Sequence, residues 1–266
     1  MLSLRHPPKQ VRTAFLSDIH LGARECRADL LLDFLHSVHM DELYLVGDIV
    51  DIWSLRRSFY WPQLHNNVLR TILGKAKHGT RVIYVPGNHD EELRDMAGMI
   101  FGNLEVQREC VHITAQGQRL LVLHGDEFDG SVKCSRWLAA LGSGAYDLTL
   151  GLNRGFNRVR HLFGYPYWSL ASYLKSRVGN ARRYVQRFEE AAARTAQRRG
   201  FDGIICGHIH RPMFAALHGV QYCNTGDWVE NCTALIEDRQ GALQLWQRAD
   251  WSVEAKAISG RLRRAA

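Results

Sequence analysis

The chain has 266 residues, of which 46% are hydrophobic and 23% charged, so it is long enough to bury the core of one large globular domain. It contains no run of about 18 apolar residues, which excludes a membrane-spanning helix of ordinary length. The first ten residues lack the apolar stretch of a secretory signal, and none of the six cysteines forms a C-x-x-C pair. We therefore expect a cytoplasmic protein with reduced cysteines.

The net charge of +7 is unevenly distributed along the chain. Residues 131–200 contain 13 Lys or Arg and 3 Asp or Glu, which gives this segment a net charge of +10. The remainder of the chain has a net charge of −3. This asymmetry predicts that the segment meets an anionic partner, such as a phosphorylated substrate or an anionic membrane surface.

Strands and helices alternate in the first half of the chain. β-branched and aromatic runs predict strands at residues 11–17, 42–46 and 81–85, and apolar residues at helical spacing predict helices at residues 27–38 and about 60–77. This alternation is typical of a layered α/β fold.

The second half begins with a predicted hairpin, whose strands lie within residues 104–113 and 119–128 around a turn at 116–118. Residues 130–200 are rich in Leu, Ala, Arg and aromatic side chains and predict three or four helices, one of them over residues 181–199. Strands are expected again at 203–206, near 213–217 and at 221–223, followed by a final hairpin of residues 232–237 and 242–247.

Five of the predicted strands end in the same kind of polar residue. Their sequences are TAFLSDIH, LYLVGDIVD, VIYVPGNHD, LLVLHGD and GIICGHIH, and they deliver Asp18, His20, Asp48, Asn88, His89, His124, His208 and His210. One such ending is an ordinary turn, because Asn, Asp and Gly are turn residues. Five such endings predict a site, because ligands bind at the carboxyl edge of open α/β sheets.

The residue types at these strand ends indicate metal ions. Two divalent cations about 3.5–4 Å apart need a shared carboxylate and several terminal nitrogen and oxygen ligands. Histidine and aspartate together suit Mn²⁺, Fe²⁺ or Zn²⁺, and the neutral oxygen of Asn88 favours the harder ions of this set. The five turns contain no cysteine, which argues against a structural zinc site. We expect two divalent ions, with Mn²⁺ preferred and Fe²⁺ or Zn²⁺ as alternatives.

The ordered motifs D-x-H, GD-x-x-D, GNH-D, H and GH-x-H resemble those of the calcineurin-like metallophosphoesterases, and they extend from Asp18 to His210. The resemblance implies a four-layer αββα sandwich of two mixed sheets. It implies that one cation is held by Asp18, His20, Asp48 and His210 and the other by Asp48, Asn88, His124 and His208, with Asp48 bridging.

The resemblance also implies the mechanism of a phosphoester hydrolase. A hydroxide formed between the cations would attack phosphorus in line. His89 would donate a proton or a hydrogen bond to the departing oxygen, and Asp51 would orient His89.

The substrate class follows from two further features. Protein phosphatases of this superfamily carry an arginine after GD-x-x-D, where this chain has Ile52. The 83 residues between His124 and His208 predict a helical cap over the cations, within one domain of residues 1–266 whose cap is residues 130–200.

With the stretches SDIHLG, GDIVDIW and GDWVE, this arrangement is similar to the UDP-2,3-diacylglucosamine pyrophosphatases of lipid A synthesis. Those enzymes usually carry arginine at the position of His89, so the chain resembles their GNHD sister group more closely. The implied reaction is hydrolysis of the diphosphate of a glycolipid nucleotide, with the protein working at the inner face of the membrane.

Substrate contacts are expected from Asn88 and from basic residues of the cap, namely Arg154, Arg158, Lys175, Arg177, Arg182 and Arg183. The alternative is that these arginines form a solvated helix face. Two other functions remain open: a phosphodiesterase acting on nucleotides or nucleic acid, and a non-catalytic interaction module. Among other polar residues, Asp126 and Asp129 are interpreted as turn residues, with support of the metal ligands as the alternative. Asp90 and Glu91 are predicted at or near the start of a helix.

Overall fold

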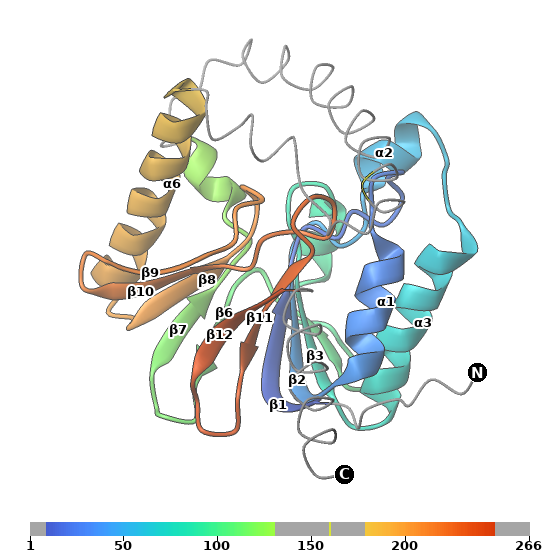
Figure 1. The fold of residues 1–266 in the computed structure, drawn as a ribbon, viewed down its shortest axis with the longest axis horizontal. Coiled ribbons are helices and arrows are strands. Elements are labelled where there is room, and N and C mark those ends of the chain that lie inside the picture. The colour runs from blue at the N-terminus through green and yellow to red at the C-terminus, as the bar shows by residue number, and fades with distance from the viewer. Residues whose placement is uncertain (1–8, 131–159, 161–178, 248–266) are drawn as a thin grey trace.

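The computed structural model describes residues 9–130, 160 and 179–247, and it contains two β-sheets that face each other (Figure 1). The larger sheet has seven strands in the order β12-β11-β1-β2-β3-β5-β4. Its strands are β1 (Lys9–Leu16), β2 (Val38–Val46), β3 (Arg81–Val85), β4 (Ile100–Phe101), β5 (Leu104–Val106), β11 (Thr233–Glu237) and β12 (Leu243–Gln247).

The smaller sheet has five strands in the order β6-β7-β8-β10-β9. They are β6 (Cys110–Ile113), β7 (Arg119–Val122), β8 (Gly203–Cys206), β9 (Met213–Leu217) and β10 (Val220–Asn224). Both sheets are mixed, because β1, β2, β3 and β5 run parallel in the first and β7, β8 and β10 in the second, with antiparallel strands at the edges.

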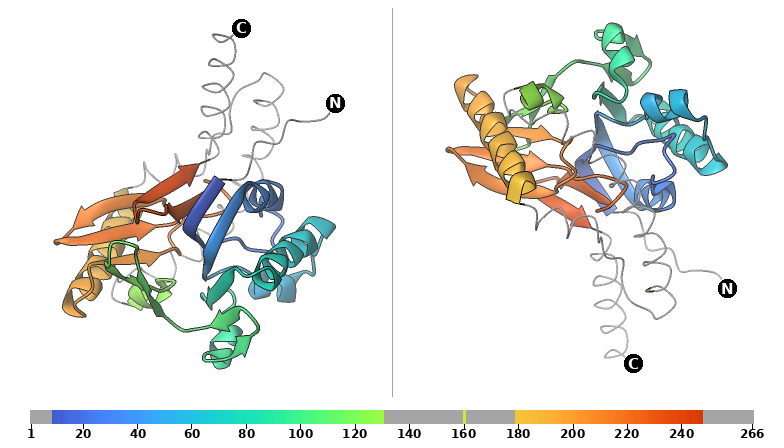
Figure 2. Two further views of the ribbon diagram at one scale, coloured as in Figure 1. Left: turned by 90° about the horizontal axis from the view of Figure 1, so that it is seen from below. Right: turned by 90° about the horizontal axis from the view of Figure 1, so that it is seen from above.

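Helices cover the outer faces of the two sheets. Helices α1 (Ala28–Ser37) and α3 (Gln63–Lys77) lie side by side on the larger sheet, and α6 (Gly179–Arg198) covers the smaller one (Figures 1 and 2). A short helix, α2 (Ile52–Arg57), follows β2. Two 3₁₀ helices, η1 (Glu91–Met96) and η2 (Asp126–Gly130), follow the turns after β3 and β7.

Three apolar clusters fill the spaces between these layers. The first joins α1 and α3 to the larger sheet through residues such as Phe34 and Val68. The second joins α6 to the smaller sheet around Phe188, and the third lies between the sheets around Phe15 and Ile205. This arrangement is a four-layer αββα sandwich, which confirms the predicted fold class.

The parallel strands bring their carboxyl ends to one edge of the sandwich. Backbone hydrogen bonds then join the turns that follow them. The amide of Asp18 donates to Gly47 O at 3.0 Å, that of His20 donates to Asp48 O at 2.9 Å, and that of Gly207 donates to His124 O at 3.0 Å. Within each sheet, neighbouring turns are therefore held together by the backbone itself.

Most predicted elements are confirmed, and residues 104–113 are the main correction. The sequence predicts one hairpin strand there, whereas the structure places β5 beside β3 in the larger sheet and β6 beside β7 in the smaller one. The polar residues 107–109 carry the chain from one sheet to the other. The helix expected after Asp90 is a 3₁₀ helix.

The predicted cap of residues 130–200 lies largely outside the described residues. Its described part is Arg160 and α6, and α6 contacts β8 and β10 of the smaller sheet. Among the described helices, none combines the length and the apolar composition that crossing a membrane requires.

Candidate metal centre

The turns at the carboxyl edge hold their side chains in an unusual backbone conformation. Five of the seven predicted ligands have positive φ angles: 50° at Asp18, 54° at His20, 55° at Asp48, 69° at His208 and 53° at His210. Residues with a Cβ rarely adopt this left-handed region, and such strain clusters at functional sites. The backbone of these turns is therefore shaped to direct the polar side chains.

One group of predicted ligands comes from the turns after β1 and β8. His210 Nε2 lies 3.2 Å from Asp18 Oδ1 and 3.3 Å from His20 Nε2. The ligand atoms of these three residues all lie within 4.8 Å of one another. Asp18 also accepts hydrogen bonds from its neighbour Ser17 and from the amide of His208, so its carboxylate is held in place.

A second group comes from the turns after β2, β7 and β8. It consists of Asp48, His124 and His208, whose ligand atoms again lie within 4.8 Å of one another. Asp48 Oδ2 is 3.4 Å from His124 Nε2 and 3.9 Å from His20 Nε2. Asp48 therefore faces both groups, as a bridging carboxylate would.

Unpartnered lone pairs at this edge fit a cation. His124 Nδ1 donates to Val46 O at 2.9 Å, which leaves the lone pair on Nε2, and this buried atom has no hydrogen-bond partner among the described residues. The buried Oδ1 of Asn88 likewise has no hydrogen-bond partner among the described residues. His20 Nδ1 lies 3.1 Å from Asp51 Oδ2 and donates to it, so a lone pair on Nε2 faces His210. Buried acceptors without donors are costly unless they bind an ion.

The carboxylates of the centre stay ionised. Burial by itself raises the pKa of Asp18 and of Asp48, but the facing histidines outweigh it and hold both pKa values below the ordinary range. Burial also raises the pKa of Asp51, but His20 and His89 outweigh this effect, so the net pKa of Asp51 lies below its ordinary range. The site therefore combines ionised carboxylates with imidazole nitrogens and an amide oxygen, which suits divalent cations.

His89 lies beside the two groups and is controlled by Asp51. Its Nδ1 is 3.0 Å from Asp51 Oδ1, an ion-pair approach outside the angular range of a hydrogen bond, and its ring lies 4.4 Å from that of Trp53. Burial lowers the pKa of His89, but Asp51 and Asp48 outweigh it, so the net pKa is raised. Asp51 in turn caps α2 by accepting from Ser54 N at 2.7 Å. The two carboxylates therefore favour the protonated form of His89.

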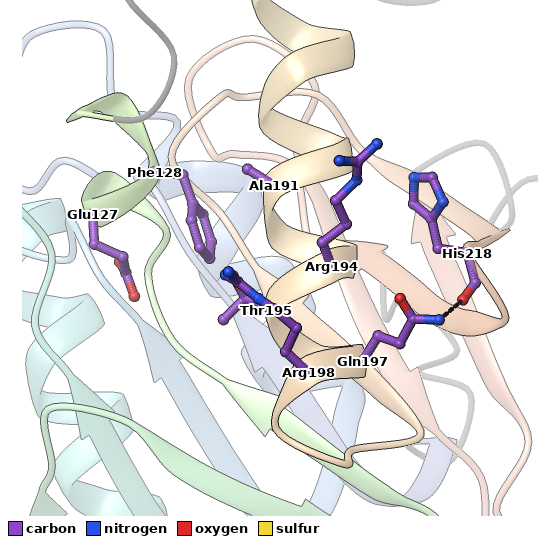
Figure 3. A pocket seen from close by; sticks show the side chains of 8 residues that line it. All are labelled: Glu127, Phe128, Ala191, Arg194, Thr195, Gln197, Arg198 and His218. Carbon is purple, nitrogen blue, oxygen red and sulfur yellow. Dashed lines mark hydrogen bonds between the residues drawn. The ribbon is translucent and has the colours of Figure 1, made fainter.

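The predicted substrate contacts are only partly described. Arg182 and Arg183 lie on α6 and are exposed, and Asn88 lies in the turn after β3. Arg154, Arg158, Lys175 and Arg177 lie outside the described residues. A hollow of about 700 Å³ lies beside α6, lined in part by Phe128, Arg194 and His218 (Figure 3). None of the described site residues predicted above lines it.

One carboxylate of the centre, Asp90, is not recognised in the sequence, and a second, Asp129, is interpreted as a turn residue with a supporting role left open. Asp90 directly precedes η1, close to the helix start that the sequence predicts. It is fully buried and accepts hydrogen bonds from the amides of Ile49 at 2.8 Å and Gly87 at 2.6 Å and from the Tyr84 hydroxyl at 2.6 Å. Asp129 is bonded to His208. The signal for Asp90 is its place directly after Asn88 and His89, where the turn needs an acceptor for its backbone amides.

Comparison with known proteins identifies the family of the chain. The model of the calcineurin-like phosphoesterase family matches residues 11–212. A UDP-2,3-diacylglucosamine hydrolase of Xanthomonas campestris pv. campestris is 29% identical over 246 residues, covering 86% of this chain and 96% of that protein. A protein of the same name from Yersinia enterocolitica is 25% identical over 227 residues, covering 80% and 86%.

A solved structure of a hypothetical protein from Pyrococcus horikoshii aligns with 94% of this chain and 94% of its own, at a TM-score of 0.47 and 11% identity. The family match covers most of the chain and includes every motif from Asp18 to His210. The chain therefore belongs to the calcineurin-like phosphoesterase family.

Proposed function

We propose that this protein uses two divalent cations to hydrolyse the diphosphate of a glycolipid nucleotide of the UDP-2,3-diacylglucosamine type. The observation that carries the proposal is the position of Asp48, which faces Asp18, His20 and His210 on one side and His124 and His208 on the other. A carboxylate shared between two sets of nitrogen and oxygen ligands is what a dinuclear site requires.

Seven side chains would hold the cations. Asp18, His20 and His210 belong to one site, Asn88, His124 and His208 to the other, and Asp48 to both. When bound, the cations would supply positive charge that activates water and neutralises the phosphate oxygens. Mn²⁺ fits this set of carboxylate, imidazole and amide ligands, and Fe²⁺ and Zn²⁺ are the alternatives.

His89 would act on the departing oxygen. Asp51 and Asp48 raise the pKa of His89, which favours its protonated form, and its ring lies at the rim of the centre rather than within either predicted ligand set. Asp51 would orient the ring from the Nδ1 side, which leaves Nε2 to face the substrate. General acid catalysis of this kind contributes about 10²–10⁴-fold to the rate.

The substrate class is supported by two independent observations. The curated relatives that span most of this chain are named UDP-2,3-diacylglucosamine hydrolases. The net charge of +10 within residues 131–200 suits a diphosphate and an anionic membrane surface. We include in the proposal a contact of this segment with such a surface.

A substrate panel tests the proposal. The full chain, stripped with a chelator and reloaded with Mn²⁺, is assayed against UDP-2,3-diacylglucosamine, bis-p-nitrophenyl phosphate and single-stranded DNA. Cleavage of the diphosphate releases UMP, which is quantified by chromatography, and we expect it to exceed turnover of the other two substrates. Preferential cleavage of DNA would replace the proposal with a nucleic-acid phosphodiesterase. A metal-loaded protein that cleaves none of the three would contradict it.

The Asp48→Asn variant is the matched control for the assay. It keeps the size of the side chain and can still accept the hydrogen bond that His89 N donates to Oδ1 at 2.8 Å. It removes the charge that would be shared by both cations. We expect Mn²⁺ stoichiometry and turnover to fall together in this variant, which links hydrolysis to this centre rather than to a contaminating enzyme.

A further inference from the structure

His208 is fixed on several sides by contacts that do not involve the other predicted ligands of its group. Its Nε2 lies 3.0 Å from Asp129 Oδ2. The ring of Phe188 stacks on it with centroids 5.9 Å apart and an interplanar angle of 29°. Its backbone amide donates to Asp18 Oδ2 at 3.0 Å. The imidazole therefore has a defined position and a defined hydrogen-bond acceptor.

Asp129 is itself held from α6. The hydroxyl of Tyr184 donates to Asp129 Oδ1, while Oδ2 is the oxygen that meets His208. Tyr184 and Phe188 are four residues apart and so lie on one face of α6. One face of this helix thus supports His208 twice, through the stacked ring of Phe188 and through the carboxylate that Tyr184 holds.

The tautomer of His208 follows from this contact. An ionised carboxylate only accepts hydrogen bonds, so Nε2 carries the proton and the lone pair is left on Nδ1. Partners of this kind orient histidine ligands and raise their basicity in metalloproteins.

We infer that Asp129 is a positioning residue that, with Tyr184 behind it, holds His208 in the tautomer and orientation needed to bind the second cation through Nδ1. The inference rests on the proposed dinuclear function and deepens it, because it assigns the support of one metal site to η2 and α6. The sequence favours a turn role for Asp129 and leaves a supporting role open; a turn role requires neither the contact with His208 nor that with Tyr184.

Titration calorimetry with Mn²⁺ tests the inference on the full chain after removal of bound metal. The native chain should bind two equivalents. Asp129→Ala should weaken one of the two by about 10–100-fold, because partners of metal ligands contribute about that much. Asp129→Asn still offers an oxygen to Nε2–H, so its loss should be smaller. Tyr184→Phe should weaken the same equivalent by less than Asp129→Ala does.

A second carboxylate on the same short helix supplies the matched control. Asp126 lies in η2 and pairs with Arg94 at 2.8 Å instead of with a histidine. Asp126→Asn should bind both equivalents like the native chain. The melting temperature of the metal-free Asp129→Ala protein should match that of the native chain, because half of the Asp129 side chain is exposed.

The outcomes separate this inference from the proposed function. Native protein that binds no Mn²⁺ would contradict the dinuclear proposal itself. Native protein that binds two equivalents, together with Asp129→Ala protein that binds both with unchanged affinity, would overturn only the role of Asp129. Equal losses in Asp129→Ala and Asp126→Asn would also overturn it, because the effect would then belong to η2 as a whole.

Discussion

Single residues at the carboxyl edge hold conformations that cost energy in isolation. A left-handed backbone at a residue other than glycine costs about 1–3 kcal/mol, and Asp18, His20, Asp48, His208 and His210 all adopt it. Backbone hydrogen bonds between the turns, such as Asp18 N to Gly47 O, offset part of this cost. The benefit is that the polar side chains of five turns face one another instead of solvent.

His89 is the residue whose change should separate catalysis from metal binding. His89→Ala should lower kcat by about 10²–10⁴-fold with little change in KM, because it removes the proposed proton donor to the leaving oxygen. Steady-state kinetics with UDP-2,3-diacylglucosamine measures the effect, and calorimetry should show that both Mn²⁺ equivalents remain.

His78, exposed at the end of α3, provides the control for this change. His78→Ala should keep the native kcat and KM. A His89→Ala enzyme with native kcat would show that the departing oxygen needs no proton from this side chain.

Asp90 is expected to be the most important buried carboxylate for local stability. Asp90→Ala leaves the amides of Ile49 and Gly87 and the hydroxyl of Tyr84 without their acceptor inside the protein. We expect a loss of about 3 kcal/mol or more in the free energy of unfolding, measured in urea with metal-free protein.

Asp95 lies in the exposed part of η1 and serves for comparison. Asp95→Ala should change the free energy of unfolding by less than about 0.5 kcal/mol. Similar losses in the two variants would show that Asp90 stabilises only as part of η1, and not through the turn after β2.

At the scale of elements, glycines let the strand ends approach one another closely. A Cβ at Gly87 would lie 2.3 Å from Asp48 Oδ1 and 2.7 Å from both Asp48 N and His124 Cδ2. At Gly47, where φ is +80°, it would lie 2.1 Å from His124 Nδ1. These glycines therefore make room for the predicted ligand side chains Asp48 and His124.

Two glycine-to-alanine changes should therefore change the stability of the folded protein in opposite directions. Gly87→Ala should destabilise the metal-free protein and weaken Mn²⁺ binding, because backbone and ligand atoms must move away from the new methyl group. Gly74→Ala, within α3 where no heavy atom comes within 4 Å of the added Cβ, should stabilise by about 0.5–1 kcal/mol. Thermal melts compare the two, and a Gly87→Ala protein that melts and binds metal like the native chain would refute the packing argument.

At the scale of the whole molecule, a buried carboxylate links the two sheets at the end away from the metal centre. Glu237 of β11 is fully buried and accepts hydrogen bonds from Thr13 of β1 at 2.9 Å, from His112 of β6 at 2.8 Å and from Ala115 N at 2.7 Å. Arg12 pairs with it at 2.8 Å. Burial raises the pKa of Glu237, but these partners outweigh it and lower the pKa to about 2.

The sign of the pH dependence follows from this depressed pKa. The carboxylate stabilises the folded protein fully above its unfolded pKa of about 4.5, and this stability is lost as pH falls toward about 2. Glu237→Gln should therefore lower the free energy of unfolding by about 3 kcal/mol at pH 7. The difference from the native chain should shrink below about pH 4.5, as urea titrations at several pH values would show.

An exposed pair serves as the control for this prediction. Glu109 meets Arg199 at the surface, so Glu109→Gln should cost less than about 1 kcal/mol at pH 7. A Glu237→Gln protein whose deficit stayed constant from pH 7 to pH 3 would show that the deficit comes from packing rather than charge.

The local pattern of the chain was sufficient to predict its layered α/β class, most of its strands and the five turns that end in polar residues. Periodicity and turn chemistry are encoded in neighbouring residues, so β3, β8 and the ligand motifs after them can be recognised without any contact between them. The family resemblance carried by those motifs supplied the two-cation hypothesis and the role expected of His89.

Other features depended on how distant segments pack. The split of residues 104–113 between two sheets, the burial of Asp90 under the turn after β2, and the line from Tyr184 through Asp129 to His208 all join residues far apart in the chain. An aspartate in a turn looks the same in sequence whether it faces water or a histidine. Only the stacking of two sheets and α6 determines which backbone amides and imidazoles come within hydrogen-bonding distance of it.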